Sequence, residues 1–550
     1  MIEIVRRLCY NESDHYPETH FDFKPSGRLK EMDGIYRLAK PKKKGLLHLI
    51  FSRIGIFALL IALQVLLYVA FYSWLDSWLP IFSAFMTVFT VVMIIYLFNC
   101  GMDSSAKLTW MLVIAVLQVP GAVFLYFTQT NVGHRKLSRR SEEMIETTRN
   151  AIPQSESVLN ALEGDASGTG DLAGYLDRSG CFPVYENTSV TYFPTGEEKF
   201  AAMLEAIAAA KKFIFMEYFI VEEGYMWGRI LELLVEKAAA GVDVRVMYDG
   251  MCEMSTLPGN YCKLLTEKGI KAKSFSPIIP VVSSHYNYRD HRKILVVDGE
   301  TAFNGGVNLA DEYINRIERF GHWKDTAVML RGEAVKTFTL LFLQMWNLDE
   351  PEPHFREWVE VPANVPEDSD GFVMPYGVCP DGKHVGEAVY MDIINRANDY
   401  VHIMTPYLIL DGELETALRY AAERGVDVRL ILPGIPDKPA AYSLAKSHYK
   451  RLVASGVKIY EYTPGFIHAK VFVSDDIKAV VGTINLDYRS LYHHFECATY
   501  MYKTSCVADI ERDFLETQEK CRRVSDQTIK DEKLSLKLMG SVMKLIAPLM

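Results

Sequence analysis

Cysteine is scarce in this 550-residue sequence, and its nine cysteines are scattered without a CxxC pair or a nearby Cys/His cluster. This spacing excludes a disulfide framework and a zinc site, and it indicates reduced thiols. Proline is also sparse, at 23 residues, while 49% of the residues are hydrophobic. That balance excludes a disordered or collagen-like chain. The length is too great for one ordinary core, so we expect at least two domains.

A basic domain is missing as well. The formal net charge is −10, and residues 135–550 alone carry 47 basic and 60 acidic residues. Nucleic-acid-binding domains usually present a basic surface, so this balance of −13 argues against a nucleic-acid partner. The sequence has no cluster of metal-ligating residues, and we expect no cofactor.

Charged residues are almost absent between positions 54 and 134, where only Asp76, Asp103 and Lys107 occur. They separate three apolar stretches, each containing the roughly 20 residues that a helix needs to cross a bilayer. We therefore predict membrane helices at about residues 54–72, 79–98 and 108–127.

The basic residues that flank these stretches indicate conflicting orientations. Four lysines within residues 40–44 precede the first stretch, and four basic residues within 135–140 follow the third. Three crossings would put the two groups on opposite sides of the membrane, against the positive-inside rule. One explanation is that the first stretch enters the membrane without crossing it, which leaves two or three crossings. We expect a multi-pass protein of the cell membrane with a cytoplasmic catalytic part.

Helical and strand-like patterns alternate beyond a polar segment rich in Ser, Glu and Gly, which predicts an α/β fold. We expect the following division: residues 1–45, a polar tail; 46–133, the membrane region; 134–185, a linker; 186–352 and 353–520, two α/β domains; 521–550, an amphipathic tail.

The α/β part contains an internal repeat. The sequence GVDVR at 241–245 recurs at 425–429, and an HxKxxxxD motif occurs twice, each time followed by Asn308 or Asn485. The separation is 177 residues for the His, Lys, Asp and Asn positions alike. A duplication explains this pattern and predicts two lobes related by a pseudo-twofold axis. The candidate catalytic residues are His291, Lys293, Asp298, His468, Lys470 and Asp475.

In a strand, the His and Lys of each motif point to the same face. Two imidazoles and two ammonium groups that converge between the lobes would bind a phosphate. One neutral histidine can attack phosphorus, and the other, protonated, can deliver a proton to the departing alkoxide. Asn308, Asn485 and Ser490 are candidate phosphate-binding residues. We expect Asp298 and Asp475, at the ends of the motif strands, to accept hydrogen bonds from turn backbone rather than contact the substrate.

These motifs resemble the phospholipase D superfamily and, more closely, the bacterial cardiolipin synthase family. The resemblance rests on RDHRK at 289–293, NGGVNLADEY at 304–313, WKD at 323–325, and GTINLDYRS at 482–490 followed by FE at 495–496. It implies duplicated α-β-α sandwich domains and phosphatidyl transfer between two phosphatidylglycerol molecules. The products would be cardiolipin and glycerol, formed through a phosphohistidine. The resemblance also implies that His291 is the nucleophile, that His468 is the acid/base, and that Asp325 and Glu496 orient the imidazoles.

Two groups of residues remain open. The histidines near the motifs that lack a repeated partner are expected to be surface or pocket-lining and not catalytic: His285, His322, His493 and His494. Near the C-terminus, apolar residues recur at helical spacing with lysines on the remaining surface: Leu534, Leu538, Val542, Leu545 and Leu549. This helix could lie in a membrane interface or pack on the globule.

Other functions are compatible with parts of the pattern. A hydrolytic phospholipase D, or a transferase that uses another alcohol, would share the phosphohistidine and differ in the acceptor. A nuclease of the same superfamily is disfavoured by the acidic balance and the membrane stretches. A catalytically inactive membrane scaffold is disfavoured by the intact His and Lys pairs.

Overall fold

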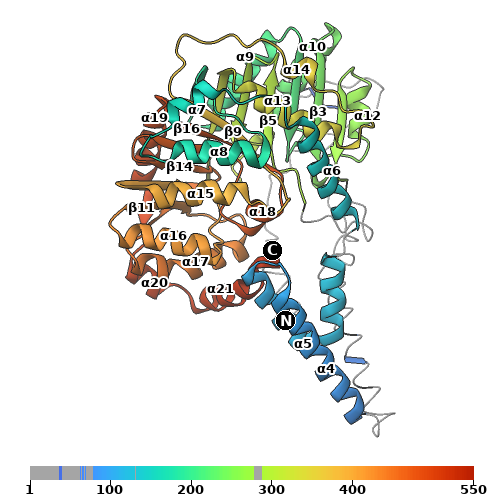
Figure 1. Ribbon diagram of the computed structural model, residues 1–550, viewed down its shortest axis with the longest axis vertical. Helices are drawn as coiled ribbons and strands as arrows, with labels where there is room; N and C mark the ends of the chain where they lie inside the picture. Colours follow the sequence, from blue (N-terminus) through green and yellow to red (C-terminus); the bar gives the residue numbers. More distant parts are fainter. Residues whose placement is uncertain are drawn as a thin grey trace, which may run out of the picture.

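The computed structural model describes residues 36–39, 62, 65, 66, 69, 79–129, 132–277 and 288–549. The expected polar tail and the first apolar stretch therefore lie almost entirely outside the described residues. In the described part, two α/β lobes lie to one side of a group of apolar helices (Figure 1).

The first lobe is built on a seven-stranded mixed sheet of order β1-β8-β6-β5-β2-β3-β4. Strands β2, β3 and β4 are parallel to one another, and the remaining pairs are antiparallel. The bounds are β1 Thr188–Phe193, β2 Phe213–Tyr218, β3 Asp243–Asp249, β4 Lys271–Phe275, β5 Lys293–Val297, β6 Thr301–Gly305 and β8 Ala327–Gly332. Its helices are α9 Gly196–Ala209, α10 Tyr225–Ala239, α11 Met251–Ser255, α12 Tyr261–Thr266, η2 Asp311–Ile314, α13 Val335–Trp346 and η3 Asn347–Asp349.

The second lobe has an eight-stranded sheet of order β17-β12-β11-β10-β14-β15-β16-β9. The bounds are β9 Phe372–Val378, β10 Tyr400–Met404, β11 Asp427–Pro433, β12 Lys458–Tyr462, β14 Val471–Ser474, β15 Lys478–Gly482, β16 Glu496–Tyr502 and β17 Cys521–Arg523. Its helices are α15 Val385–Arg396, α16 Gly412–Glu423, α17 Pro439–Ala454, α18 Tyr488–Tyr492, α19 Cys506–Glu519, α20 Asp526–Asp531, α21 Leu534–Ile546 and η4 Ala547–Leu549. The short helix α14 (Arg356–Val359), which precedes β9, packs on α13 of the first lobe.

The two sheets have the same topology once β17, the added edge strand, is set aside. The first sheet reads β1-β8-β6-β5-β2-β3-β4, and the second, read from β9, is β9-β16-β15-β14-β10-β11-β12. In both sheets the first strand in the chain is at one edge and its neighbour is the last, and the motif strands β5 and β14 occupy equivalent central places. The duplication and the α/β class expected from the sequence are confirmed. A further two-stranded sheet links the lobes, because β7 (His322–Lys324) pairs in parallel with β13 (Gly465–Ile467).

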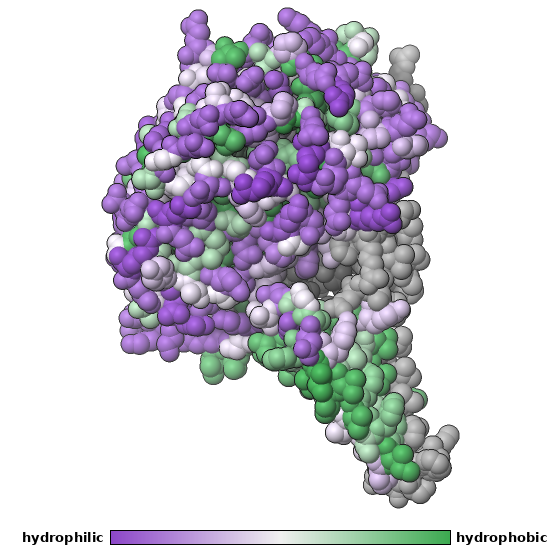
Figure 2. All heavy atoms as spheres, viewed as in Figure 1, coloured by the Kyte–Doolittle hydropathy of each residue, from purple (hydrophilic) through white to green (hydrophobic). Residues whose placement is uncertain are grey.

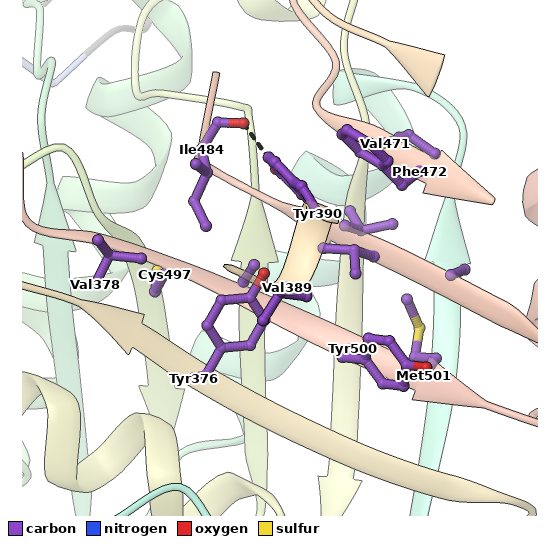
Figure 3. Close-up of a cluster of buried hydrophobic side chains, with 14 of the residues drawn as sticks. Tyr376, Val378, Val389, Tyr390, Val471, Phe472, Ile484, Cys497, Tyr500 and Met501 are labelled. Atoms are coloured by element: carbon purple, nitrogen blue, oxygen red, sulfur yellow. Dashed lines mark hydrogen bonds between the residues drawn. The ribbon is translucent and has the colours of Figure 1, made fainter. Parts of the chain in front are cut away.

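Alternating side chains of the strands build cores on both faces of each sheet. Along β2, Phe213 and Phe215 join the cluster that includes α13, whereas Ile214 and Met216 join the cluster that includes α9 and α10. The ring of Phe215 stacks 4.7 Å from Phe342 of α13. This alternation is what a sheet between two helical layers requires. In the second lobe (Figure 3), Tyr390 of α15 stacks on Phe472 of β14 and donates a 2.8 Å hydrogen bond to the Ile484 carbonyl.

Two described helices are long and apolar enough to cross a membrane, over Pro80–Asn99 and Ser104–Tyr126, with mean hydropathies of 2.4 and 2.1. They belong to α4 (Leu79–Asn99) and α5 (Ser104–Gln129). Hydrophobic residues gather over this part of the molecule, while the visible surface of the lobes is mostly hydrophilic (Figure 2).

Helix α5 is not straight. Gln118 has φ 45° and ψ −115°, outside the helical region, and Pro120 follows it. The rings of Trp110 and Phe124 lie 5.4 Å apart, although 14 residues of straight helix would separate them by about 21 Å. The α5 segment is thus a hairpin with two limbs side by side, which differs from the straight crossing predicted over residues 108–127. The reason is local, because proline lacks an amide donor and its ring blocks the preceding helical turn.

The polar segment expected as a linker forms three helices, α6 Val132–Thr148, α7 Glu156–Leu162 and α8 Thr169–Gly180. They pack on the lobes, since Met144, Leu162, Leu172 and Leu176 join the main hydrophobic cluster. Arg140 of α6 also forms an ion pair with Asp349 at 2.9 Å.

Candidate active site

The two HxK motifs lie where the lobes meet, and each is attached to the opposite lobe by its backbone. The amide of His291 donates to the carbonyl of Phe495 at 2.9 Å, and the amide of His468 donates to the carbonyl of Lys324 at 2.7 Å. Each motif histidine is thus held beside a carboxylate of the other lobe, Glu496 at the start of β16 or Asp325 directly after β7.

The carboxylates complete this crossed arrangement. His291 Nδ1 lies 2.8 Å from Glu496 Oε2, and His468 Nδ1 lies 2.6 Å from Asp325 Oδ2. Both carboxylates are fully buried. A carboxylate bonded to one ring nitrogen fixes the orientation of the ring, which leaves Nε2 of each histidine for the substrate.

Both motif lysines are buried beside the histidines. The Nζ of Lys470 lies 3.0 Å from His468 Nδ1, and the Nζ of Lys293 donates to the His291 carbonyl at 2.5 Å. Burial lowers the pKa of Lys293 to about 8 and that of Lys470 to about 7. A buried ammonium without a matching negative charge is costly. The site is therefore poised to take up an anion.

The two histidine–carboxylate pairs differ electrostatically. Burial and the nearby lysines lower the pKa of His468 to about 4 and hold the pKa of His291 well below its usual range. Burial raises the pKa of Glu496 well above its usual value. Burial acts to raise the pKa of Asp325, but the interactions with His468 and Lys470 together outweigh the effect of burial. The pKa of Asp325 is therefore below its usual value. Asp325 is thus the carboxylate better able to support a positive charge on its histidine.

The candidate phosphate-binding side chains lie near the motifs but are engaged with the protein. Asn308 accepts from the Ile220 amide at 3.1 Å and donates to the Tyr313 hydroxyl at 2.8 Å. Asn485 donates to the Ser490 hydroxyl at 3.1 Å. Each asparagine is thus hydrogen-bonded to the side chain five positions later in the chain. These hydrogen bonds hold the turn beside the histidines.

Asp298 and Asp475 lie at the far ends of the motif strands. Asp298 accepts three backbone hydrogen bonds, from residues 211, 212 and 213, at 2.7–2.8 Å. Asp475 accepts the equivalent three, from residues 398, 399 and 400, at 2.9–3.0 Å. Five residues of strand separate each aspartate from its lysine, about 16 Å. These contacts fit the structural role expected from the sequence.

Four residues near the histidines were not singled out from the sequence. Trp323 and Tyr313 each contact the His468 ring at a centroid distance of 5.4 Å, and Phe219 contacts the His291 ring at 4.9 Å. The Thr483 hydroxyl donates to Glu496 Oε2 at 2.5 Å. Tyr313 lies 177 residues before Ser490, which is the offset of the internal repeat. The repeat could therefore have identified Tyr313 as a site residue from the sequence.

The four histidines without a repeated partner have different surroundings. His285 lies outside the described residues, and His322 is exposed, with its Nδ1 3.0 Å from the Tyr462 hydroxyl. His493 contacts the Tyr288 ring. His494 is buried, and its ring centroid lies 5.4 Å from that of His291. His494 therefore belongs to the wall of the site.

Comparison with known proteins points to one family. The profile described as "Cardiolipin synthase, PLD-like domain" matches residues 203–346 and 390–517, one block in each lobe. A cardiolipin synthase of Alkalihalophilus pseudofirmus is 32% identical over 476 residues, covering 85% of this chain and 93% of that protein. A cardiolipin synthase of Halalkalibacterium halodurans is 31% identical over 505 residues, covering 91% and 100%.

An uncharacterized protein of Streptococcus mutans is 56% identical over 463 residues, covering 83% of this chain and 99% of that protein. Among solved structures, a phosphatidylserine synthase of Haemophilus influenzae has a TM-score of 0.51 and 16% identity, covering 66% of this chain and 93% of that chain. That likeness supports the fold alone. On the sequence matches, the chain belongs to the cardiolipin synthase family of phospholipase D-like proteins.

Proposed function

We propose that this protein is a cardiolipin synthase, a phosphatidyltransferase that converts two phosphatidylglycerol molecules into cardiolipin and glycerol. The observation that carries the proposal is the crossed site, in which two buried histidines, each bonded to a carboxylate of the other lobe, share one pair of lysines. Such a site offers a nucleophile, a proton donor and a binding place for one phosphodiester anion.

In the first half-reaction, Nε2 of one histidine attacks the phosphorus of a bound phosphatidylglycerol. The phosphorus–oxygen bond to the headgroup glycerol breaks, and the departing oxygen takes a proton from the other histidine. The bound phosphodiester opposes the charge of the two lysines, which raises the pKa of that histidine from its low value in the empty site. The products are glycerol and a phosphatidylated histidine.

In the second half-reaction, a headgroup hydroxyl of another phosphatidylglycerol gives its proton to the now neutral histidine. Its oxygen attacks phosphorus, the phosphorus–nitrogen bond breaks, and cardiolipin is released. The number of phosphodiester bonds is conserved, so no external energy source is needed.

The difference between the two carboxylates supports His291 as the nucleophile and His468 as the acid/base. The pKa of Asp325 is lowered, so this carboxylate is ionised and stabilises the imidazolium that an acid catalyst must form. The pKa of Glu496 is raised by burial, so His291 is held in place with less stabilisation of its charged form. A neutral imidazole is the form that attacks phosphorus.

The membrane topology can be inferred from the ends of the apolar segments. Before them, residues 36–39 reach the first lobe, where the Leu38 amide donates to Glu223 at 3.2 Å. Near the start of α5, the chain is again at the globule, since the Thr109 hydroxyl donates to the Leu545 carbonyl at 2.8 Å. After them, α6 packs on α13 and pairs with Asp349.

These contacts support an even number of crossings, of which α4 supplies one. The other is the crossing predicted from the sequence at 54–72, which lies almost entirely outside the described residues. Helix α5 then enters the membrane and returns on the same side through its reversal at Gln118. This arrangement puts the basic groups at 40–44 and 135–140 on the side of the catalytic lobes, which removes the conflict in the sequence. By the positive-inside rule, that side is the cytoplasm.

The deciding experiment supplies the purified protein with phosphatidylglycerol alone and measures cardiolipin and free glycerol. We expect the two products in equal amounts. Phosphatidic acid as the only lipid product would replace the synthase proposal with hydrolysis. His291→Ala and His468→Ala are the matched variants, and either one turning over at a near-normal rate would contradict the paired-histidine mechanism.

A further inference from the structure

Helix α21 presents an apolar ridge that no described part of the chain covers. Its residues Leu534, Leu538, Val542 and Leu545 are between 52% and 70% exposed. They fall within about 80° of one another around the helix, at 100° per residue. Gly540 lies on the opposite face, where a Cβ atom would come within 2.4 Å of the Ser443 carbonyl, so this side of α21 is seated on α17. The ridge is the side turned away from the globule.

The end of α21 reaches the apolar helices. The carbonyl of Leu545 accepts the hydrogen bond from Thr109, five residues into α5, and η4 also contacts α5. Leu108 and Leu112 of α5 are themselves exposed, so the apolar surface continues from one helix to the other. In Figure 2 hydrophobic residues also protrude from the lower edge of the globule, the region in which Figure 1 shows α21.

This contact sets the depth at which α21 can lie. Five residues of helix correspond to about 7.5 Å, so Leu545 is roughly that far along α5 from its first residue. Amphipathic helices in membrane interfaces bury their apolar faces by about 5–10 Å. Lys533, Lys537 and Lys544 are exposed on the flank of the helix between the ridge and the side seated on α17. Lys544 lies 3.8 Å from Glu415, and Lys537 donates to the Lys530 carbonyl, so Lys533 is the lysine best able to complement anionic headgroups.

We propose that α21 is a membrane-interface helix whose ridge of Leu534, Leu538, Val542 and Leu545 inserts among anionic lipids. The helix fixes the second lobe against the bilayer and so sets the tilt of the catalytic lobes above it. The proposal depends on the membrane placement of α4 and α5, and it does not depend on which reaction the site catalyses.

The test uses the full chain reconstituted into vesicles of phosphatidylglycerol and phosphatidylcholine. Leu538→Cys is labelled with an environment-sensitive fluorophore, and lipids with nitroxides near the headgroup are added. Tyr420→Cys on α16, whose side chain is 58% exposed compared with 59% for Leu538, is the matched control. The unsubstituted chain gives the background from native cysteines. Unchanged thermal unfolding shows that each variant is folded.

We expect the emission at position 538 to be shifted to the blue and reduced at least about twofold by the nitroxide lipids. The emission at position 420 should stay unchanged. Equal quenching at the two positions would overturn the proposal. Because the readout is optical, this outcome is separate from any failure of the cardiolipin assay.

A second inference comes from His494. Neither of its ring nitrogens has a hydrogen-bond partner among the described residues, although both atoms are buried. Glu496 Oε1 lies 3.6 Å from Nδ1 of His494, and that oxygen also lacks a hydrogen-bond partner within the described part of the chain. Buried polar groups left unpaired are costly, so these atoms point to a ligand.

The charge around His494 indicates which ligand. The ligand atoms of His291, His494 and Glu496 lie within 4.8 Å of one another, close enough to suggest a metal. However, Arg289, Arg489 and Lys293 surround the His494 ring with positive charge. This field repels a cation and attracts an anion.

The geometry points to His494 as a third histidine of the substrate site, donating an N–H to a phosphoryl oxygen of the lipid bound at His291. This role rests on the proposed phosphatidyl transfer, and it would make His494 a residue that touches substrate. Its position beside the His291 ring, 5.4 Å between centroids, gives the reach that this contact needs.

The test measures inorganic phosphate binding to the detergent-solubilised protein by calorimetry, which requires no turnover. His494→Phe keeps a planar ring and removes both nitrogens, whereas His494→Asn keeps an N–H donor. We expect the dissociation constant to rise about 10-fold or more for His494→Phe and clearly less for His494→Asn, because a hydrogen bond to a charged group is lost only in the former. Equal effects of the two variants, or none, would overturn the assignment. Thermal unfolding checks that both variants fold.

Discussion

His468 and Asp325 lie in different lobes, 143 residues apart, yet their side chains approach to 2.6 Å. His291 and Glu496 repeat this relationship with the lobes exchanged. Each lobe thus supplies one reacting ring and the carboxylate that holds the other ring. The four groups depend on the lobe interface rather than on either sheet alone.

Replacing Asp325 by Asn should lower the rate of cardiolipin formation by about two orders of magnitude or more, because the amide cannot stabilise an imidazolium. The loss of the ionised carboxylate also lowers the pKa of His468. The proton donor would then be lost at a lower pH, so the alkaline limb of the rate profile should move to lower pH. Rate profiles of the wild type and of Glu496→Gln, which acts on His291, provide the comparison. An unchanged alkaline limb in Asp325→Asn would contradict the assignment of His468 as the acid.

The KM for phosphatidylglycerol should rise as the pH is raised through about 7 and 8, the lowered pKa values of Lys470 and Lys293. Above these values the free site loses the charges that bind the phosphodiester, and substrate binding must then be accompanied by proton uptake. Lys470→Arg remains charged throughout this range. Its KM should therefore depend less steeply on pH. A wild-type KM that stays constant over this interval would count against the lysines as the anion site.

Asp298→Ala should destabilise the protein by about 2–4 kcal/mol, since three backbone N–H groups lose their acceptor. Asp475→Ala removes an equivalent set at a more exposed position, so its effect should be smaller. Thermal unfolding in detergent measures both. The kcat of the folded Asp298→Ala protein should fall far less than that of His291→Ala. Comparable losses of kcat would instead assign Asp298 a chemical role.

The reversal in α5 predicts that its two ends face the same side of the membrane. Single cysteines at Ser104 and Arg139 should both react with a membrane-impermeant maleimide in inverted vesicles, and neither should react in intact spheroplasts. The unsubstituted chain reports the background of native cysteines. If the two positions reacted from opposite sides, α5 would be a true crossing.

The sequence was sufficient to predict the duplication because a shared offset of 177 residues survives in the His, Lys, Asp and Asn positions. A sequence pattern that is repeated at one offset predicts that the two lobes have the same strand order, and the two sheets do have the same order. The motif histidines could also be named in advance, because only a few side chains combine nucleophilic and acid/base chemistry.

The sequence did not reveal two features that depend on contacts made after folding. His494 has no counterpart in the first repeat, where Trp323 occupies the corresponding place, so a search for symmetry passes over it. The apolar stretch around Gln118 has the composition of a single crossing, and its reversal becomes evident from the backbone of Gln118 and the contact between Trp110 and Phe124. Hydropathy measures how apolar a segment is, and it carries little information on where the backbone turns.

The parallel pairing of β7 with β13 and the exchanged carboxylates have an evolutionary consequence. A single ancestral unit could have formed this catalytic centre only by associating with a second copy of itself, at a rate limited by encounter. Fusion into one polypeptide replaced that encounter with a tether, which raises the effective concentration of the partner into the millimolar range. It also freed the two halves to diverge, so that one carboxylate became an aspartate and the other a glutamate, and two formerly equivalent histidines could take different roles.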